Sequence, residues 1–98
     1  MTGDLTSFDL HHDPAARRFS TRLEGSEAEL VYSLRDGRMV IDHTGVPEAI
    51  GGRGVAAALV RAALDYARAQ GWRVVPACSY SAAYVQRHPE YADLVDAA

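Results

Sequence analysis

Lysine is absent from the 98-residue sequence. All ten basic residues are arginine, and with thirteen acidic residues they give a formal net charge of −3 at pH 7. Without lysine the chain cannot form a phosphate loop of the Gly-Lys-Ser/Thr type, a Schiff base or a lysine general base. The acidic balance also lacks the electrostatic footprint of a nucleic-acid-binding protein, so we expect no nucleic-acid partner.

Cysteine occurs once, at Cys78. One thiol excludes an internal disulfide and cannot by itself build a zinc site, so we expect a cytosolic, cytoplasmic setting and no metal. The adjacent His11 and His12 fall on an expected strand and point to opposite faces, so they cannot chelate one ion together. No apolar run approaches the roughly 20 residues of a membrane span, and the first residues do not resemble a signal peptide. We therefore expect no membrane association.

The composition, 48% hydrophobic and 23% charged, is that of an ordinary globular protein. The length allows one domain over residues 1–98, and we expect a monomer or a weak dimer.

The first half of the chain predicts an antiparallel sheet. Apolar and polar residues alternate over four runs: 7–12, 18–23, 28–35 and 38–46. Asp36-Gly37 predicts a type I′ turn between the last two runs, because both residue types accept positive φ angles. A two-residue loop there predicts three facing pairs on one apolar face: Leu34 with Met39, Tyr32 with Ile41, and Leu30 with His43. The opposite face is mostly polar, as in a sheet covered on one side.

The second half predicts helices around one more strand. Apolar residues recur at helical spacing from Gly54 to Gln70, and Gly71 is placed to stop the helix. Residues 72–78 predict a strand and residues 81–87 a short helix, with His88 as its cap before Pro89. The intervening helix makes the strands at 38–46 and 72–78 parallel. The expected fold class is α/β (α+β): a mixed, mostly antiparallel sheet of about five strands with one long and one short C-terminal helix.

A glycine-rich segment, VPEAIGGRGVA at residues 46–56, joins an expected strand to the long helix. Glycine lets the backbone approach a ligand, the N–H groups at a helix start attract phosphate, and Arg53 can add a charged contact. A turn that is glycine-rich for packing alone is the alternative. Gly52, Gly54 and Ala57 also fit the dinucleotide pattern G-x-G-x-x-A, but the preceding strands are antiparallel and no acidic residue follows about twenty positions on.

The segment resembles the acetyl-CoA loop of the Gcn5-related N-acetyltransferases (GNAT superfamily), which reads Arg/Gln-x-x-Gly-x-Gly/Ala. The corresponding residues here are Gly51-Gly52-Arg53-Gly54-Val55-Ala56. Gly54 and Ala56 match the pattern. Gly51 stands at the Arg/Gln position, so pyrophosphate binding is either weaker or passes to Arg53.

A narrower resemblance, to the compact single-domain acetyltransferase-like family of the YjdJ type, spans nearly the whole chain. It rests on Arg18-Phe19, Tyr32, His43-Thr44, Val46-Pro47, the glycine loop, Val75-Pro76-Ala77-Cys78 and Arg87-His88-Pro89-Glu90-Tyr91. That family often has a glutamate between Thr44 and Val46, where this chain has Gly45. No general base is therefore inferred from that position.

The resemblance implies acetyl-CoA as cosubstrate and no metal. The strands at 38–46 and 72–78 would part, and the pantetheine arm would lie in the gap, bound by backbone N–H groups near Thr44 and Val46. The phosphates would bind at residues 51–56, and Tyr84 would contribute to the cofactor site. Pro76 is consistent with a place where strand pairing ends, because proline has no N–H.

Four side chains are candidates for the chemistry. Cys78 lies where a thioester would reach and near a helix start, which favours a thiolate and an acetyl-cysteine intermediate. A buried cysteine that acts as a small hydrophobic residue is the alternative. His43 is a candidate base or a structural histidine. Tyr84 and Tyr91 can protonate a leaving thiolate or simply pack at the edge of the core.

The expected function is N-acetyl transfer from acetyl-CoA to an amine of a small molecule or peptide. The first alternative is a non-catalytic CoA-binding module or sensor that acts with a protein partner. Residues 13–17 leave room only for a turn, where larger relatives have helices that shape an acceptor pocket, and this favours the module. An interaction domain that does not bind CoA is the third class.

Overall fold

One five-stranded sheet organises the computed structural model, which describes residues 8–96. Its strands, in spatial and sequence order, are β1 (His11–Asp13), β2 (Arg18–Leu23), β3 (Ser26–Arg35), β4 (Arg38–Gly45) and β5 (Arg73–Pro76). The pairs from β1 to β4 are antiparallel, and β4 pairs with β5 in parallel. The predicted mixed, mostly antiparallel sheet is confirmed.

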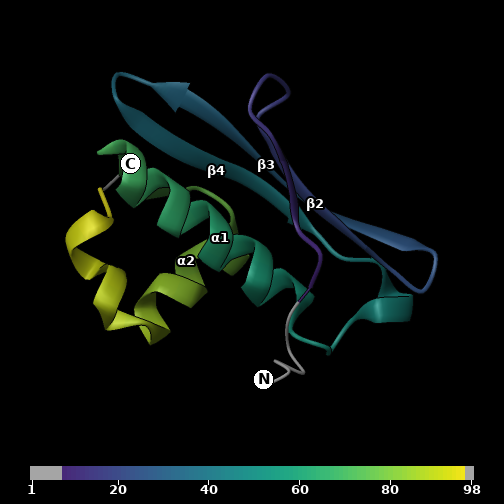
Figure 1. Ribbon diagram of the computed structural model, residues 1–98. Coiled ribbons are helices and arrows are strands. Elements are labelled where there is room, and N and C mark those ends of the chain that lie inside the picture. The colour runs from purple at the N-terminus through teal and green to yellow at the C-terminus, as the bar shows by residue number, and fades with distance from the viewer. Residues whose placement is uncertain (1–7, 97–98) are drawn as a thin grey trace, which may run out of the picture.

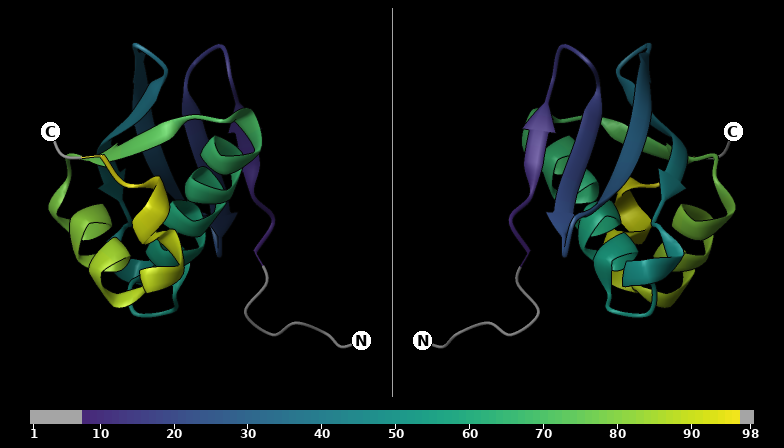
Figure 2. Two further views of the ribbon diagram at one scale, coloured as in Figure 1. Left: turned by 90° about the vertical axis from the view of Figure 1, so that its left-hand side faces the viewer. Right: turned by 90° about the vertical axis from the view of Figure 1, so that its right-hand side faces the viewer.

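Two α-helices and two short 3-10 helices complete the fold: α1 (Val55–Gln70), α2 (Ser79–Arg87), η1 (Glu48–Ile50) and η2 (Pro89–Leu94). Helices α1 and α2 lie on the same face of the sheet, as Figures 1 and 2 show. Within residues 8–96, no helix covers the opposite, outer face. The prediction of one long and one short helix is confirmed, although α2 begins at Ser79 instead of Ser81, and η2 is an addition that the periodicity did not indicate.

Two tight turns set the register of the antiparallel strands. Glu24 and Gly25 have φ angles of 52° and 81°, and Asp36 and Gly37 have 51° and 76°. Positive φ at both central residues is the type I′ geometry, whose twist matches that of the paired strands. The turn predicted at Asp36-Gly37 is therefore confirmed.

The register prediction fails at one point in the β3–β4 hairpin. Two predicted pairs are present, Leu34 with Met39 and Tyr32 with Ile41. The register then shifts, and the third predicted pair is wrong because Leu30 faces Thr44 and Val31 faces His43.

The shift is a β-bulge with Asp42 as the extra residue. One added residue exchanges the two faces of everything that follows it in the strand. His43 is consequently exposed on the outer face, whereas Thr44 turns toward the helices. The alternation of apolar and polar residues within β4 cannot reveal this bulge, because the bulge depends on how β3 pairs with β4.

The core lies between α1 and the covered face of the sheet. The buried side chains of α1 are Val55, Leu59, Val60, Ala63, Leu64 and Ala67. They pack against buried residues of the strands, among them Leu30, Met39, Ile41 and Val74. Burying each large aliphatic side chain contributes about 1.5–3 kcal/mol. Gly71 ends the helix with φ 77°, as predicted.

An aromatic cluster anchors β1 to this core. The ring of His12 stacks on Phe19 with 4.0 Å between centroids and meets Tyr66 edge-on at 4.4 Å. Its Nε2 shares a hydrogen bond of 2.6 Å with the hydroxyl of Tyr32. Burial lowers the pKa of His12, and the nearby carboxylate of Asp13 only partly opposes this. The folded protein therefore favours the neutral imidazole.

We expect acid to destabilise the protein through His12. Its pKa is lower in the folded than in the unfolded chain, so the unfolded chain takes up the proton first. The free energy of unfolding should therefore fall as the pH drops below about 6.5, the ordinary pKa of imidazole. His12→Gln, which cannot titrate, should remove this part of the pH dependence. Denaturant unfolding at about pH 7.5 and about pH 5 measures the difference.

The matched control is His11→Gln, because His11 is exposed on the outer face. This variant should keep the wild-type pH dependence. An equal loss of stability in wild type and His12→Gln would contradict the role given to His12.

Candidate functional site

Strands β4 and β5 part halfway along β4. They pair from Arg38 with Arg73 to Ile41 with Pro76. The carbonyl oxygen of Ile41 then accepts hydrogen bonds from the N–H groups of both Ala77 and Cys78, each 3.1 Å. β4 continues to Gly45, whereas the chain after Pro76 turns into α2. The last strand is thus shorter than the predicted 72–78, and beyond Ile41 the β5 side of β4 has lost its partner.

Thr44 and Cys78 meet across this parting. The hydroxyl of Thr44 lies 3.6 Å from the Cys78 sulfur. The contact depends on the bulge, which turns Thr44 to the covered face. Cys78 is also the N-cap of α2, because this helix begins at Ser79, two residues earlier than predicted. Its sulfur accepts a hydrogen bond from the Ser81 N–H at 3.4 Å and lies 3.1 Å from the Ser81 hydroxyl oxygen.

These contacts favour the thiolate of Cys78. Partial burial raises the pKa of the Cys78 thiol, but the hydrogen bond between this thiol and the Ser81 hydroxyl and the bond from the Ser81 N–H outweigh burial, and Thr44 and the Tyr80 N–H add to their effect. The net shift is downward. The side chain is also partly exposed. Both properties agree better with the reactive thiol than with an inert core residue, and nucleophilic attack stays a prediction.

His43 lies on the other side of β4 from Thr44. A Cβ atom added to Gly45 would lie 2.8 Å from the Nε2 atom of His43, so the imidazole occupies the space above this glycine. Among the described residues, no hydrogen bond joins His43 to Cys78. The structure therefore brings Thr44 and Cys78 together and leaves His43 on the open face.

The glycine loop needs glycine at two of its positions. Gly52 and Gly54 have φ angles of 77° and 82°, and a Cβ on either would meet no atom within 4 Å. Backbone conformation, rather than lack of space, thus requires glycine at both. Gly51 has an extended backbone with φ −68°, so geometry does not require glycine there.

The start of α1 presents free backbone N–H groups. Its first intrahelical bond runs from the Ala58 N–H to the Gly54 carbonyl, 3.0 Å, so the preceding amides point out of the helix end. Gly54 supplies no side-chain cap, and the first turn contains no acidic residue. The positive end of the helix dipole is therefore open to an anion at Val55 and Ala56.

Arg53 is held away from this helix start by an ion pair. Its guanidinium forms two hydrogen bonds with the carboxylate of Glu24, of 2.7 and 3.0 Å. Both side chains are exposed, so the pair stabilises the fold little. Phosphate binding by Arg53 requires that a phosphate replace Glu24, and it stays a prediction.

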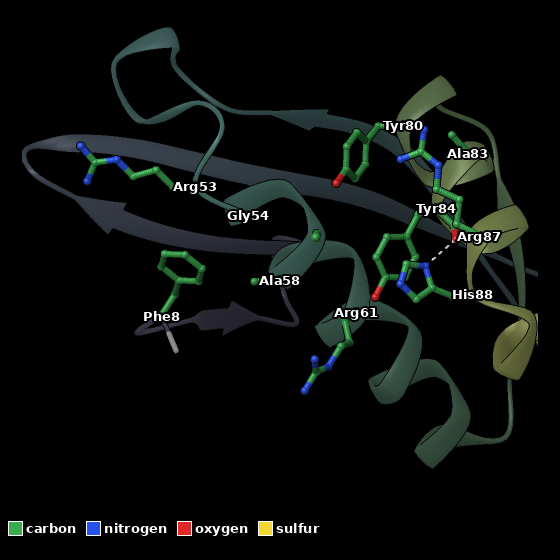
Figure 3. Close-up of a pocket in the computed structure, with 11 residues that line it drawn as sticks. Phe8, Arg53, Gly54, Ala58, Arg61, Tyr80, Ala83, Tyr84, Arg87 and His88 are labelled. Carbon is green, nitrogen blue, oxygen red and sulfur yellow. Dashed lines mark hydrogen bonds between the residues drawn. The ribbon is translucent and has the colours of Figure 1, made fainter. Parts of the chain in front are cut away.

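A cavity of about 390 Å³ lies between the first half of α1 and α2, as Figure 3 shows. It is lined by Phe8, Arg53, Gly54, Ala57, Ala58, Arg61, Tyr80, Ala83, Tyr84, Arg87 and His88. Of these residues, the sequence indicated Arg53, Gly54 and Tyr84 for cofactor binding, but not Arg61 or Arg87. An arginine on a helix surface carries no local sign of the cavity it borders, and only the packing of α1 against α2 reveals it.

The two candidate tyrosines have different surroundings. The ring of Tyr84 borders the cavity and stacks on His88, with 3.9 Å between centroids. His88 is the C-cap residue of α2, as predicted. The hydroxyl of Tyr91 instead donates to Asp65 at 2.7 Å, and burial together with this bond raises the pKa of Tyr91. The contacts of Tyr91 are those of a packing residue.

Comparison with known proteins decides the family. The sequence family described as GCN5-related N-acetyl-transferase matches residues 18–94. The chain belongs to this family. The solution structure of a GCN5-like protein from Staphylococcus aureus superposes on this structure with a TM-score of 0.73. The two sequences are 26% identical, and the match covers 93% of this chain and 90% of that one.

The curated relatives are similar over most of their length. Protein NATD1 of Mus musculus is 39% identical over 82% of this chain and 76% of its own. Protein NATD1 of Danio rerio is 35% identical over 92% of this chain and 86% of its own. Both alignments cover most of this chain, so the similarity is not confined to a short motif.

A metal site and a membrane-spanning helix are both absent from residues 8–96. No group of three or more His, Cys, Asp or Glu side chains is placed to hold a metal ion. In the same part of the chain, none of the helices has the length and apolar character that crossing a membrane requires.

We expect Cys78 to react at lower pH than an ordinary thiol. The rate of its alkylation by iodoacetamide, followed against pH by intact mass, should give a midpoint below the usual cysteine range. Ser81→Ala should raise that midpoint, because it removes a hydroxyl that stabilises the thiolate.

Ser79→Ala is the matched control. Ser79 is exposed in the same turn of α2, and no hydrogen bond among the described residues joins its side chain to Cys78. Equal midpoints for wild type and Ser81→Ala would show that Ser81 does not set the reactivity of the thiol.

Proposed function

We propose that this protein binds acetyl-CoA and transfers the acetyl group to an amine of a small molecule or peptide. The observation that carries the proposal is that two features lie along one stretch of chain, the parting of β4 from β5 and the open start of α1. The open start of α1 follows β4 after η1 and the glycine loop, and β4 runs past the end of β5 with Thr44 opposite Cys78. One ligand can therefore bind phosphate at the helix and place a thioester in the parting.

The helix start fits a diphosphate. The backbone N–H groups of Val55 and Ala56 are free of intrahelical partners, and the left-handed Gly52 and Gly54 keep side chains off the path. Hydrogen bonds from such groups to an anion are strengthened by charge. The diphosphate of coenzyme A would bind here without a lysine, in keeping with the composition of the chain.

The parting fits the pantetheine arm. Beyond Ile41, the edge of β4 that faced β5 has backbone groups without strand partners. An extended segment with amide groups can add to such an edge as a further strand does. Pantetheine contains two amides in an extended chain. Backbone N–H groups near Thr44 and Val46 would then orient the thioester carbonyl and polarise it.

Cys78 supports a two-step transfer. Its thiolate would attack the thioester carbonyl carbon, forming a new carbon–sulfur bond as the bond to the CoA sulfur breaks. CoA then leaves as a thiolate, which takes up a proton. The acceptor amine would next attack the acetyl-cysteine, lose a proton and release the Cys78 thiolate.

His43 supports the direct alternative, in which the amine attacks the bound thioester itself. The imidazole is exposed on the outer face of β4, which no described helix covers. An amine that approached from that face would meet His43 as the base that accepts its proton. The two routes differ in whether the protein itself becomes acetylated.

A CoA-binding module without turnover is the second candidate. Two observations favour it: Gly51 stands at the Arg/Gln position of the family loop, and no helix formed by residues 8–96 lies on the outer face to enclose an acceptor. In that case the protein would bind acetyl-CoA and signal its presence to a protein partner.

Acetyl-CoA should stabilise the folded protein by about 2–3 kcal/mol at roughly a hundredfold excess over its dissociation constant, by mass action. Gly54→Val should abolish this effect, because a β-branched residue resists the φ angle of 82° that opens the helix start. A thermal-shift titration, supported by calorimetry, measures both.

Gly71→Val is the matched control. Gly71 has nearly the same backbone angles at the opposite end of α1. The substitution should destabilise the protein and leave the response to acetyl-CoA intact. If millimolar acetyl-CoA shifted neither the melting temperature nor the calorimetric baseline of the wild type, the proposed function would be wrong.

Acetyl-CoA should add one acetyl group to the protein if Cys78 is the nucleophile. Hydroxylamine should remove that group, as it cleaves thioesters, and Cys78→Ala should lose the label while it still binds acetyl-CoA. The readout is intact mass. The absence of lysine leaves the N-terminal amine as the only other ready acceptor, and an amide there would survive hydroxylamine.

Each mechanism gives a different result in this experiment. Direct transfer predicts no label, product with a panel of amines, and an active Cys78→Ala variant. A binding module predicts neither label nor product. Label that persists in Cys78→Ala would rule out Cys78 as the acetylated residue.

A further inference from the structure

The β-bulge leaves two consecutive polar side chains, Asp42 and His43, on the outer face of β4. The carboxylate of Asp42 accepts a hydrogen bond from the hydroxyl of Ser33 on β3, and His43 faces Val31 in the same strand pair. Both residues are exposed, and both belong to the stretch of β4 beyond Ile41, where β5 no longer pairs. They therefore border the parting on its outer side, which no helix of residues 8–96 covers (Figure 1).

The two functional groups lie at different places on this face. The carboxylate of Asp42 is directed to Ser33, whereas the imidazole of His43 leans over Gly45, where an added Cβ would lie 2.8 Å from its Nε2 atom. Gly45 faces Glu29, which is four residues from Ser33 along β3. The carboxylate and the imidazole are therefore separated by roughly two to three residues of strand, about 7–10 Å.

The described fold does not neutralise the charge of Asp42. Within residues 8–96, no arginine or histidine nitrogen lies within 4 Å of its carboxylate. The other carboxylate beside this region, that of Glu29, is bound by Arg18 at 2.7 Å. Between the positions of Ser33 and Glu29 on β3 lies the half-buried Val31. The outer face thus offers a base, an apolar surface and an unpaired anion in that order.

A carboxylate beside the attacking nitrogen would slow acetyl transfer. A primary alkyl amine is an ammonium ion near neutral pH, because its pKa is close to the value of about 10.4 for lysine. A neighbouring negative charge would raise the pKa of this amine further and hold its nitrogen in the form that has no lone pair. His43 therefore suits the nitrogen that reacts, and Asp42, set apart from it, suits a second cationic group of the same acceptor.

We propose that the acceptor is a diamine-like molecule, with two cationic groups joined by an aliphatic spacer. Asp42 binds the ammonium group that does not react, and Val31 contacts the spacer. The other amine nitrogen forms the new bond to the acetyl carbon as the bond to the CoA sulfur breaks, and His43 accepts the proton that this nitrogen loses. The inference rests on the proposed function and adds a substrate class to it. Asp42 determines specificity without touching the reacting atoms.

Steady-state transfer from saturating acetyl-CoA to cadaverine and to pentylamine tests this assignment. The two amines share a five-carbon chain, and only cadaverine has a second ammonium group. After correction for its two equivalent amines, cadaverine should have a kcat/KM about three- to fivefold higher, the range that an exposed charge pair supports. Added salt should reduce this difference, because ions screen exposed charges.

Asp42→Asn should lower the kcat/KM for cadaverine to that for pentylamine, mainly through KM. Its amide oxygen can still accept the hydrogen bond from Ser33, so the variant should fold, and thermal unfolding verifies this. Asp36→Asn is the matched control, because it removes the same charge from the exposed turn of the same hairpin. Asparagine accepts the φ angle of 51° at that position, and this variant should keep the wild-type preference for cadaverine.

The possible failures differ in what they contradict. Equal wild-type kcat/KM for the two amines would overturn the inference and leave the proposed function standing. An equal loss for both amines in Asp42→Asn would also overturn it, because a purely structural role has that effect. Wild-type protein that binds acetyl-CoA but acetylates neither amine would overturn the inference and favour the binding module. Failure to bind acetyl-CoA would contradict the proposed function, and this inference with it.

Discussion

The carbonyl oxygen of Ile41 accepts two hydrogen bonds, from the N–H groups of Ala77 and Cys78, and the candidate site depends on this arrangement. Both amides of the chain leaving β5 are used at one point of β4, so β5 cannot continue beside it. The chain turns into α2 instead, with Cys78 as the N-cap. The same turn brings α2 alongside α1, and the cavity lies between these two helices. The two hydrogen bonds to the Ile41 carbonyl oxygen thus determine where the sheet ends, where the Cys78 thiol lies and how α2 comes to border the cavity.

The bulge at Asp42 determines which side chains reach that point. In an uninterrupted hairpin, His43 would lie under the helices and Thr44 would be exposed. The extra residue reverses this, so that Thr44 meets Cys78 and His43 lies above Gly45 on the open face. The bulge therefore separates two chemical roles, polar contact with the thiol on one side of β4 and a candidate base on the other.

The arginines divide into two groups with different surroundings. Several form ion pairs on the surface, as Arg18 does with Glu29, Arg53 with Glu24 and Arg68 with Asp93. Exposed pairs of this kind contribute little to stability, because water and salt screen them. Arg61 and Arg87 instead border the cavity, and within residues 8–96 neither of them forms an ion pair. In this chain the exposed ion pairs therefore stabilise the fold less than the buried face of α1 does.

The sequence by itself determined the features that depend on a residue's own backbone preferences or on neighbours within a turn. The Asp36-Gly37 turn, the span of α1 with its stop at Gly71, the parallel crossover and the glycine loop are of this kind. Tertiary structure decided the bulge, the early end of β5, the start of α2 at Ser79 and the placement of Arg61 and Arg87 at one cavity. Thr44 and Cys78 are 34 positions apart, and their contact follows from how two strands separate. Periodicity describes one element at a time, so it cannot indicate which residue of another element will lie opposite.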